Sequence, residues 1–262
     1  EYVVVLSGDH IYKMDYAEMV RRHKETQADC TIAVINVPPE ETSRFGIMST
    51  DADGRIVKFE EKPKKTDSTQ ASMGVYVFSK DKLFQYLEAD DRDPSSENDF
   101  GKNIIPHMLS AGERMFAYPF EGYWKDVGTI QSLWEANMDL LGDRPALDLR
   151  DESWRIFSRN YAEPPPFVGE NAVIGNALVT EGCEIYGSVV NSVISGGVVV
   201  EKGANIVDSV IMPGTVVRKG ACVTRTIVSE NCVIGENCVV GAAGGPIALV
   251  GYSTRIPAGG HA

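Results

Sequence analysis

The sequence repeats itself at a step of 17 residues: Asn191-Ser192-Val193-Ile194 recurs as Asp208-Ser209-Val210-Ile211 and again as Arg225-Thr226-Ile227-Val228. At the same step, Val199-Val200-Glu201-Lys202-Gly203-Ala204 recurs as Val216-Val217-Arg218-Lys219-Gly220-Ala221, and Val233-Ile234-Gly235-Glu236-Asn237-Cys238 follows. Three hexapeptides make about 18 residues, which is one circuit of a three-sided parallel β-helix whose circuits bury their inward side chains against each other. The repeat predicts such a β-helix over residues 167–251. The alternative is a β-sandwich with chance similarity between its strands.

The segments that flank the repeat lack its pattern. Residues 142–166 end in Pro164-Pro165-Pro166 and predict a linker that is extended at its end. Residues 252–262 predict a mobile tail. The repeat region therefore forms a domain of its own, preceded by a different domain over residues 1–141.

Residues 1–141 alternate between strand and helix patterns. Residues 2–6 are apolar on both faces, as in a central strand of a parallel sheet. Asp15 is predicted to cap a helix that runs to about Gln27, and residues 29–37 predict the next strand. Such a strand–helix–strand unit belongs to an α/β sheet, where ligands lie at the carboxyl ends of the strands. Gly8-Asp9 lies at such an end.

Further elements follow the same α/β pattern. Residues 47–50 and 56–60 predict a hairpin around the turn sequence Asp51-Ala52-Asp53-Gly54. Residues 72–78 predict another strand, and residues 80–87 and 130–141 predict helices. The chain begins at Glu1 inside an apparent strand, so we expect that residues upstream of it are missing.

Composition narrows the class of protein. The chain has 262 residues, is 43% hydrophobic and 24% charged, and carries a net charge of −12, which makes a nucleic-acid surface unexpected. No apolar run approaches the roughly 18 residues of a membrane helix, and no signal-peptide pattern opens the chain. The five cysteines form no CxxC pair, so we interpret them as reduced core residues of a cytoplasmic protein.

Five short motifs in a fixed order carry a specific resemblance. They are Gly8-Asp9-His10-Ile11-Tyr12-Lys13-Met14-Asp15-Tyr16, Phe59-Glu60-Glu61-Lys62-Pro63, Ala71-Ser72-Met73-Gly74, Asn98-Asp99-Phe100-Gly101-Lys102 and Tyr123-Trp124-Lys125-Asp126-Val127-Gly128-Thr129. Together with the hexapeptide repeat, they make nearly the whole chain resemble glucose-1-phosphate adenylyltransferase (ADP-glucose pyrophosphorylase). The resemblance implies a Rossmann-like α/β nucleotidyltransferase domain followed by a left-handed parallel β-helix.

The resemblance also implies an activity. The family joins glucose 1-phosphate to ATP, releases pyrophosphate and supplies ADP-glucose for glycogen and starch synthesis. Two polyanions must meet, so positioning and charge neutralisation dominate the catalysis. Mg²⁺ prefers carboxylate oxygens, and Asp9 and Asp126 match the two family carboxylates that hold it. Lys62 matches the cation on the phosphate of the sugar phosphate, and we expect Asp9, Lys62 and Asp126 to be catalytic.

Three further residues match contacts to the sugar. Glu61 would accept hydrogen bonds from sugar hydroxyls, Ser72 matches a serine that touches glucose, and Gly46 matches a glycine whose backbone approaches the same sugar. Within the fourth motif, we expect Asp99 to cap a helix and Phe100 to lie in the core. His10 is expected near the site without acting as a general base, because a phosphate nucleophile carries no proton that must be removed at pH 7.

The Gly-rich phosphate loop that opens the family is missing from the sequence. The stretch Gly241-Ala242-Ala243-Gly244-Gly245 has no basic partner and follows a β-helix coil. We therefore expect this chain to keep the sugar-phosphate side without the nucleotide side and to be inactive alone. We also expect the first strand to show an unpaired edge or an unusual partner.

Other readings of the sequence remain open. One is a non-catalytic regulatory or assembly subunit of the same enzyme, which the retained Asp9, Lys62 and Asp126 disfavour. Another is an acyltransferase built on the β-helix, which would need a histidine in the coils, where the sequence has none. The partners that the resemblance implies are ATP, glucose 1-phosphate and a homotetramer or a heterotetramer with a related subunit, with no nucleic acid and no membrane.

Overall fold

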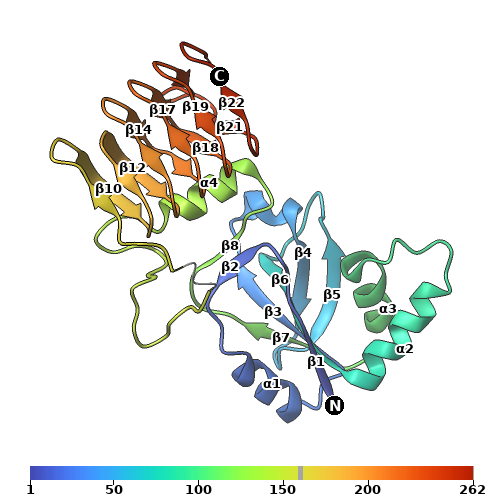
Figure 1. Ribbon diagram of the computed structural model, residues 1–262. Helices are drawn as coiled ribbons and strands as arrows, with labels where there is room; N and C mark the ends of the chain where they lie inside the picture. Colours follow the sequence, from blue (N-terminus) through green and yellow to red (C-terminus); the bar gives the residue numbers. More distant parts are fainter. Residues whose placement is uncertain (159–161, 262) are drawn as a thin grey trace. The chain divides into compact units, whose positions relative to one another are not determined.

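The computed structural model describes residues 1–158 and 162–261 (Figure 1). The chain divides into two compact units, Glu1–Trp124 and Lys125–Ala262. This boundary differs from the expected domain end at residue 141, because helix α4 (Ile130–Met138) packs on strand β12 (Ser188–Ile194) of the second unit. No helix or strand is described in residues 142–158 and 162–166, where the linker was expected.

The first unit is built on a mixed sheet with the strand order β5-β4-β6-β3-β7, and β1 pairs with β6. The strands are β1 (Tyr2–Val5), β3 (Cys30–Asn36), β4 (Gly46–Thr50), β5 (Ile56–Glu61), β6 (Gln70–Ser79) and β7 (Met115–Pro119). The predicted hairpin is confirmed, because β4 and β5 are antiparallel and meet at the turn, where the Asp51 carboxylate accepts the backbone N–H groups of Asp53 and Arg55.

Strand β1 departs from the expectation of a central parallel strand. It is antiparallel to β6, and β6 separates it from β3, so the two predicted strands are not neighbours. Among the described residues β1 pairs with β6 alone, and Tyr2 and Val4 are exposed. An apolar run on both faces indicates burial but does not name the partner, which is why the neighbour was predicted wrongly. The expectation of an unpaired edge or an unusual partner is confirmed.

Helices cover the two faces of this sheet (Figure 1). Helix α1 (Tyr16–Glu25) begins after Asp15, whose carboxylate accepts the Ala17 N–H, as predicted, and its Met19 packs with Ala33 and Val75 on one face. The other face packs Ile32 and Phe78 against α2 (Lys80–Asp91), the π-helix η2 (Phe100–Ile104) and α3 (Ile105–Ser110). A 3₁₀ helix, η1 (Pro39–Arg44), precedes β4.

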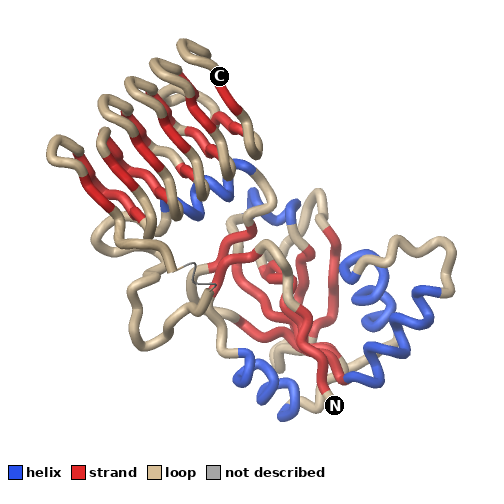
Figure 2. The backbone as a smooth tube through the Cα atoms, viewed as in Figure 1, coloured by secondary structure: helices blue, strands red, loops and turns tan. Residues whose placement is uncertain are grey.

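The second unit is a parallel β-helix whose coils stack in register (Figure 2). Val193 pairs with Val210, Val199 with Val216 and Asn205 with Cys222, so the 17-residue repeat of the sequence is the step between coils. The short strands are β9 (Phe167–Val168), β10 (Val173–Val179), β11 (Glu184–Ile185), β12, β13 (Val199–Val200), β14 (Asn205–Val207), β15 (Val210–Ile211), β16 (Val216–Val217), β17 (Cys222–Thr224), β18 (Thr226–Val228), β19 (Val233–Ile234), β20 (Val239–Val240), β21 (Ala248–Val250) and β22 (Arg255–Ile256).

The β-helix continues beyond its expected end at residue 251. Strand β22 pairs with β19, and Ile256 packs against the interior of the coils, so the expected mobile tail is wrong for this segment. In the last coil Thr226 pairs with Ala248, a step of 22, and the Gly-rich stretch from Gly241 to Gly245 lies in that longer coil. A segment that packs its apolar side chains inward extends the β-helix, whatever the length of the loop that precedes it.

Asparagine side chains form a ladder at one corner of the coils. Asn176, Asn191 and Asp208 take left-handed backbone conformations with φ between 45° and 50°. The Asn176 amide donates to Asn191 Oδ1 and the Asn191 amide donates to Asp208 Oδ1, both at 2.7 Å. Asn and Asp tolerate this conformation better than other non-glycine residues, so the repeat places them where the chain must turn.

All five cysteines are free, as expected, and four of them are buried. Within the described residues, no helix combines the length and apolar character required to cross a membrane.

Candidate functional site

The β4–β5 hairpin places three of the sequence-predicted site residues together. Gly46 pairs directly with Glu61 in the antiparallel register, and Lys62 follows with its backbone N–H donating to the Phe45 carbonyl at 3.0 Å. Lys62 has a left-handed φ of 46°, which is uncommon for a lysine. Its side chain is 63% exposed, and its ammonium lies 3.9 Å from Glu61 Oε1. A carboxylate and the ammonium of an exposed lysine thus lie side by side at the end of β5.

Glu61 is held among glycine backbones. Only 24% of its side chain is exposed. A Cβ added to Gly46 would lie 2.9 Å from Glu61 Oε2, and a Cβ added to Gly101 would lie 2.9 Å from Glu61 Cδ. Burial raises the pKa of the Glu61 carboxyl, Asp99 raises it further, and the cations Lys62 and Lys102 oppose the shift. The carboxylate is therefore a partly desolvated acceptor with Lys62 as its nearby cation.

Ser72 lies on β6 and is 92% buried, since its exposed fraction is 8%. Its hydroxyl accepts the Gly74 N–H at 3.2 Å and donates to the Tyr76 Oη at 3.4 Å. The Tyr76 hydroxyl also feels the charges of Glu61 and Asp99, and burial raises the pKa of Tyr76 to about 12. Tyr76 is therefore a neutral phenol. It is hydrogen-bonded to Ser72 and interacts electrostatically with Glu61. The sequence did not reveal this connection.

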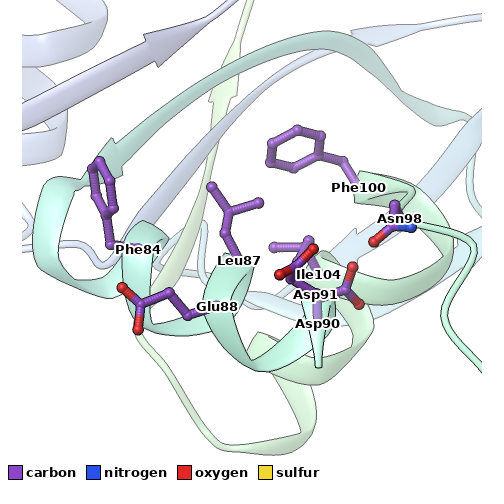
Figure 3. Close-up of a pocket in the computed structure, with 8 residues that line it drawn as sticks. All are labelled: Phe84, Leu87, Glu88, Asp90, Asp91, Asn98, Phe100 and Ile104. Atoms are coloured by element: carbon purple, nitrogen blue, oxygen red, sulfur yellow. The ribbon is translucent and has the colours of Figure 1, made fainter. Parts of the chain in front are cut away.

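The Asp99-Phe100-Gly101-Lys102 motif opens η2. Asp99 caps the helix as expected, with its carboxylate accepting the Lys102 N–H at 2.9 Å. Phe100 is half-buried, packs against the core and stacks on the Tyr76 ring at 5.7 Å between centroids. On the outer side of η2, a hollow of about 400 Å³ is lined by Phe100 and Ile104 and by Phe84 and Leu87 of α2, with acidic residues around it (Figure 3). Phe100 thus separates this hollow from the Tyr76 side.

A second group of residues contains both predicted metal carboxylates. Asp9 precedes β2 (His10–Tyr12), Asp126 ends β8 (Trp124–Asp126), and these two short strands pair. One ligand atom each from Asp9, His10 and Asp126 lies within 4.8 Å of the others. Two carboxylates fit the oxygen preference of Mg²⁺. The imidazole is an additional donor that sequence reasoning did not count as a ligand.

His10 connects this group to β6. Its Nδ1–H donates to the Met73 carbonyl at 2.7 Å, because a carbonyl oxygen can only accept, and this leaves Nε2 facing Asp9 Oδ1 at 3.7 Å. Met73 follows Ser72, so the two groups meet along Ser72–Gly74. The hydrogen bond to Met73 fixes the orientation of the His10 ring beside Asp9.

Trp124 adds a buried donor. Its indole Nε1 has no hydrogen-bond partner among the described residues. The ring contacts His10 and Phe45 edge-on, each at 5.2 Å between centroids. Buried N–H groups are rarely left unpaired in folded proteins. A ligand or a water molecule between the two groups is the natural acceptor.

Comparison with known proteins matches both parts of the chain. A nucleotidyl transferase family model matches residues 1–142, and a model described as GlmU-like, C-terminal hexapeptide matches residues 166–244. Proteins named glucose-1-phosphate adenylyltransferase are 55% identical over 241 residues in Desulforamulus reducens, 59% over 206 in Clostridium kluyveri and 52% over 234 in Bacillus cereus. These alignments cover 90%, 79% and 89% of this chain and 60%, 54% and 62% of those relatives.

The chain thus spans about 60% of the length of the curated relatives that it matches. The nucleotidyl transferase match covers more than half of the chain and includes Gly46, Glu61, Lys62, Ser72, Asp9 and Asp126. The α/β sheet and the hexapeptide β-helix follow in the order of the two matched models. The chain belongs to the nucleotidyl transferase family and is a homologue of the glucose-1-phosphate adenylyltransferases.

Proposed function

We propose that this chain forms the glucose 1-phosphate side of a glucose-1-phosphate adenylyltransferase site, in an enzyme that makes ADP-glucose and pyrophosphate from ATP and glucose 1-phosphate. The observation that carries the proposal is the arrangement at the end of β5, where the half-buried Glu61 carboxylate adjoins the exposed Lys62 ammonium. A sugar phosphate offers the complementary pair of groups, hydroxyl donors and a dianion.

Lys62 is the residue proposed to bind the phosphate. Its side chain is largely exposed, and its ammonium lies 3.9 Å from Glu61 Oε1, beyond hydrogen-bond distance. An incoming phosphate can therefore take a short, charge-assisted hydrogen bond without breaking an existing one. The left-handed turn at Lys62 directs the chain away from β5 immediately after Glu61.

Glu61 and Ser72 are proposed to bind the sugar. Glu61 is partly desolvated and acceptor-only when ionised, so hydroxyl donors of glucose would stabilise its charge. Ser72 is buried beside Tyr76, and a ligand hydroxyl can replace the long 3.4 Å contact between their oxygens. Gly46 leaves the space beside Glu61 free of a side chain.

The metal-binding role is proposed for Asp9 and Asp126. A bound Mg²⁺ neutralises phosphate charge where the two polyanions meet. Asp9 and Asp126 would hold it through carboxylate oxygens, with His10 alongside them. The chain's own residues do no proton abstraction in this scheme, because the sugar phosphate is ionised at pH 7; they bind, orient and screen.

Calorimetry with glucose 1-phosphate tests the proposal. Lys62→Ala should weaken binding by the roughly 1.5–3 kcal/mol of a charged hydrogen bond, about 10- to 150-fold. Lys64→Ala is the matched control: it removes the same charge from an exposed lysine two residues along, which lines another hollow with Lys58 and Lys65. Equal effects of the two substitutions would reduce the site to general electrostatics and contradict the proposal.

A second arm separates phosphate from sugar recognition. Lys62→Ala should weaken inorganic phosphate as well, whereas Glu61→Gln should weaken glucose 1-phosphate and leave inorganic phosphate unchanged. The tetrameric assembly and the inactivity of these 262 residues alone stay predictions, which sedimentation and an ATP-dependent ADP-glucose assay check.

A further inference from the structure

Gly101 lies where a helix would normally favour a side chain. It is the second residue of η2, it is buried, and its φ is not in the left-handed region. Alanine is a better helix former than glycine, which costs backbone entropy. No turn or left-handed conformation explains the glycine, so the reason lies in what surrounds it.

The surroundings of Gly101 are the carboxylates of Glu61 and Asp99. A Cβ built on Gly101 would lie 2.9 Å from Glu61 Cδ, closer still to Oε2, and 3.4 Å from Asp99 Oδ1. Contact between non-bonded carbons is normally about 3.5–4.0 Å. Asp99 would tolerate the added methyl group, but Glu61 would not. The clash is confined to the end of one side chain.

The Glu61 carboxylate lies between Gly101 of η2 and Gly46 of β4. On the side of β4, a Cβ on Gly46 would lie 2.9 Å from Glu61 Oε2, so the carboxylate already fills the space that both glycines leave. Helix η2 is fixed by Ile104 and by the following Ile105, which are 2% and 0% exposed. A methyl group at position 101 would therefore move the Glu61 carboxylate outward, toward solvent.

We propose that Gly101 is a positioning residue, which acts through Glu61 by leaving the space that seats its carboxylate for sugar binding. The proposal rests on the proposed function for its ligand, glucose 1-phosphate, and on geometry alone for the seat. Gly46 shares the seat, but a Cβ there would also meet the Phe59 ring at 2.5 Å. Gly101→Ala is therefore the cleaner substitution.

The first readout is the environment of the Glu61 carboxylate. It is monitored by ¹³C NMR of the glutamate carboxyl groups in the whole chain. The Glu61 signal is assigned by its loss in Glu61→Gln. The titratable groups around Glu61 are Lys62, Asp99, Lys102 and Tyr76. We expect a raised Glu61 pKa in the wild-type chain and a shift toward the ordinary glutamate value in Gly101→Ala. Gly175→Ala, where no atom lies within 4 Å of the added Cβ, is the control.

The second readout is affinity by calorimetry. Gly101→Ala should bind glucose 1-phosphate about tenfold or more weakly, the loss of one charge-assisted hydrogen bond, with unchanged affinity for inorganic phosphate. Adding Glu61→Asp, which shortens the side chain by one methylene, should restore part of the affinity. A structural role alone would move both ligands together and would not respond to Glu61→Asp.

The outcomes separate the two proposals. If Gly101→Ala leaves both the Glu61 titration and the glucose 1-phosphate affinity unchanged, the positioning role is overturned. If the titration shifts but the wild-type chain binds no glucose 1-phosphate, the seat stands and the proposed function fails. Should Gly101→Ala not fold, Gly101→Ala combined with Glu61→Ala must fold, because the clash is then gone; failure of that double variant also overturns the proposal.

Discussion

Substituting Gly46 by Ala distinguishes its two roles, access for a ligand and packing within the sheet. Gly46 is buried, and the added Cβ would lie 2.5 Å from Phe59 Cζ and 3.0 Å from Phe59 Cε2. To reach ordinary carbon–carbon contact, the ring must shift by about 1 Å. Phe59 packs against the core cluster that includes Met48 and Ile56, so the shift is transmitted to tightly packed neighbours.

The expected cost follows from that overpacking. Inserting a methyl group into a packed region costs typically about 1–3 kcal/mol. Replacing any glycine by alanine also removes roughly 0.4–1 kcal/mol of unfolded-state entropy, which opposes the loss. Gly8→Ala measures the second effect alone, because nothing lies within 4 Å of its Cβ and it belongs to the same unit.

Urea denaturation followed by circular dichroism gives the required difference. We expect Gly46→Ala to be about 1–3 kcal/mol less stable than Gly8→Ala, with a midpoint lower by several °C on heating. If the two variants are equally stable while glucose 1-phosphate binding is lost in Gly46→Ala, Gly46 serves ligand access alone and the packing explanation is refuted.

Two further predictions concern charge. Glu61→Gln should stabilise the fold at neutral pH, because burial raises the Glu61 pKa and the ionised form is therefore disfavoured in the native state. This gain in unfolding free energy should shrink as pH falls through the raised pKa toward the ordinary 4.5. Urea titrations at several pH values measure it, and a stability difference that widens on acidification would contradict the prediction. Asp9→Asn should weaken Mn²⁺ binding by about tenfold or more, as measured by electron paramagnetic resonance. Asp15→Asn is the control: Asp15 caps α1, and its substitution should leave Mn²⁺ binding unchanged.

The sequence predicted the β-helix well because periodicity determines it. Each inward residue at a step of 17 has a counterpart in the next coil, and Val199–Val216 and Asn205–Cys222 pair as the repeat requires. The sheet of the first unit was harder. Apolar runs located β1 and β3, but strand order depends on contacts between distant segments, and β6 lies between them.

The site was predicted in part for the same reason. The resemblance pointed to Gly46, Glu61 and Lys62, which the β4–β5 hairpin brings together. Tyr76 lies in none of the five motifs, and although Gly101 belongs to the fourth, the relation of both residues to Glu61 exists only after β5, β6 and η2 have packed. The unpartnered Trp124 indole is likewise visible only as a buried donor in the folded chain.

Left-handed residues occur both in the β-helix and at the candidate site. In the β-helix, Asn176, Asn191, Asp208 and Arg225 adopt positive φ at a recurring corner, and a side-chain ladder joins the first three. Lys62 adopts φ 46° outside such a repeat, at a cost of about 1–2 kcal/mol.

Other features of the first unit are also costly to the fold. Glu61 is partly desolvated, Gly101 forgoes helix propensity, and the Trp124 N–H is unpaired among the described residues. Folding alone favours none of these features, and each has a local structural explanation when taken singly. Under the proposed function, a bound sugar phosphate would satisfy the Glu61 carboxylate and the Lys62 ammonium together. The pairing of these two groups at the end of β5 is therefore better explained by ligand binding than by stability.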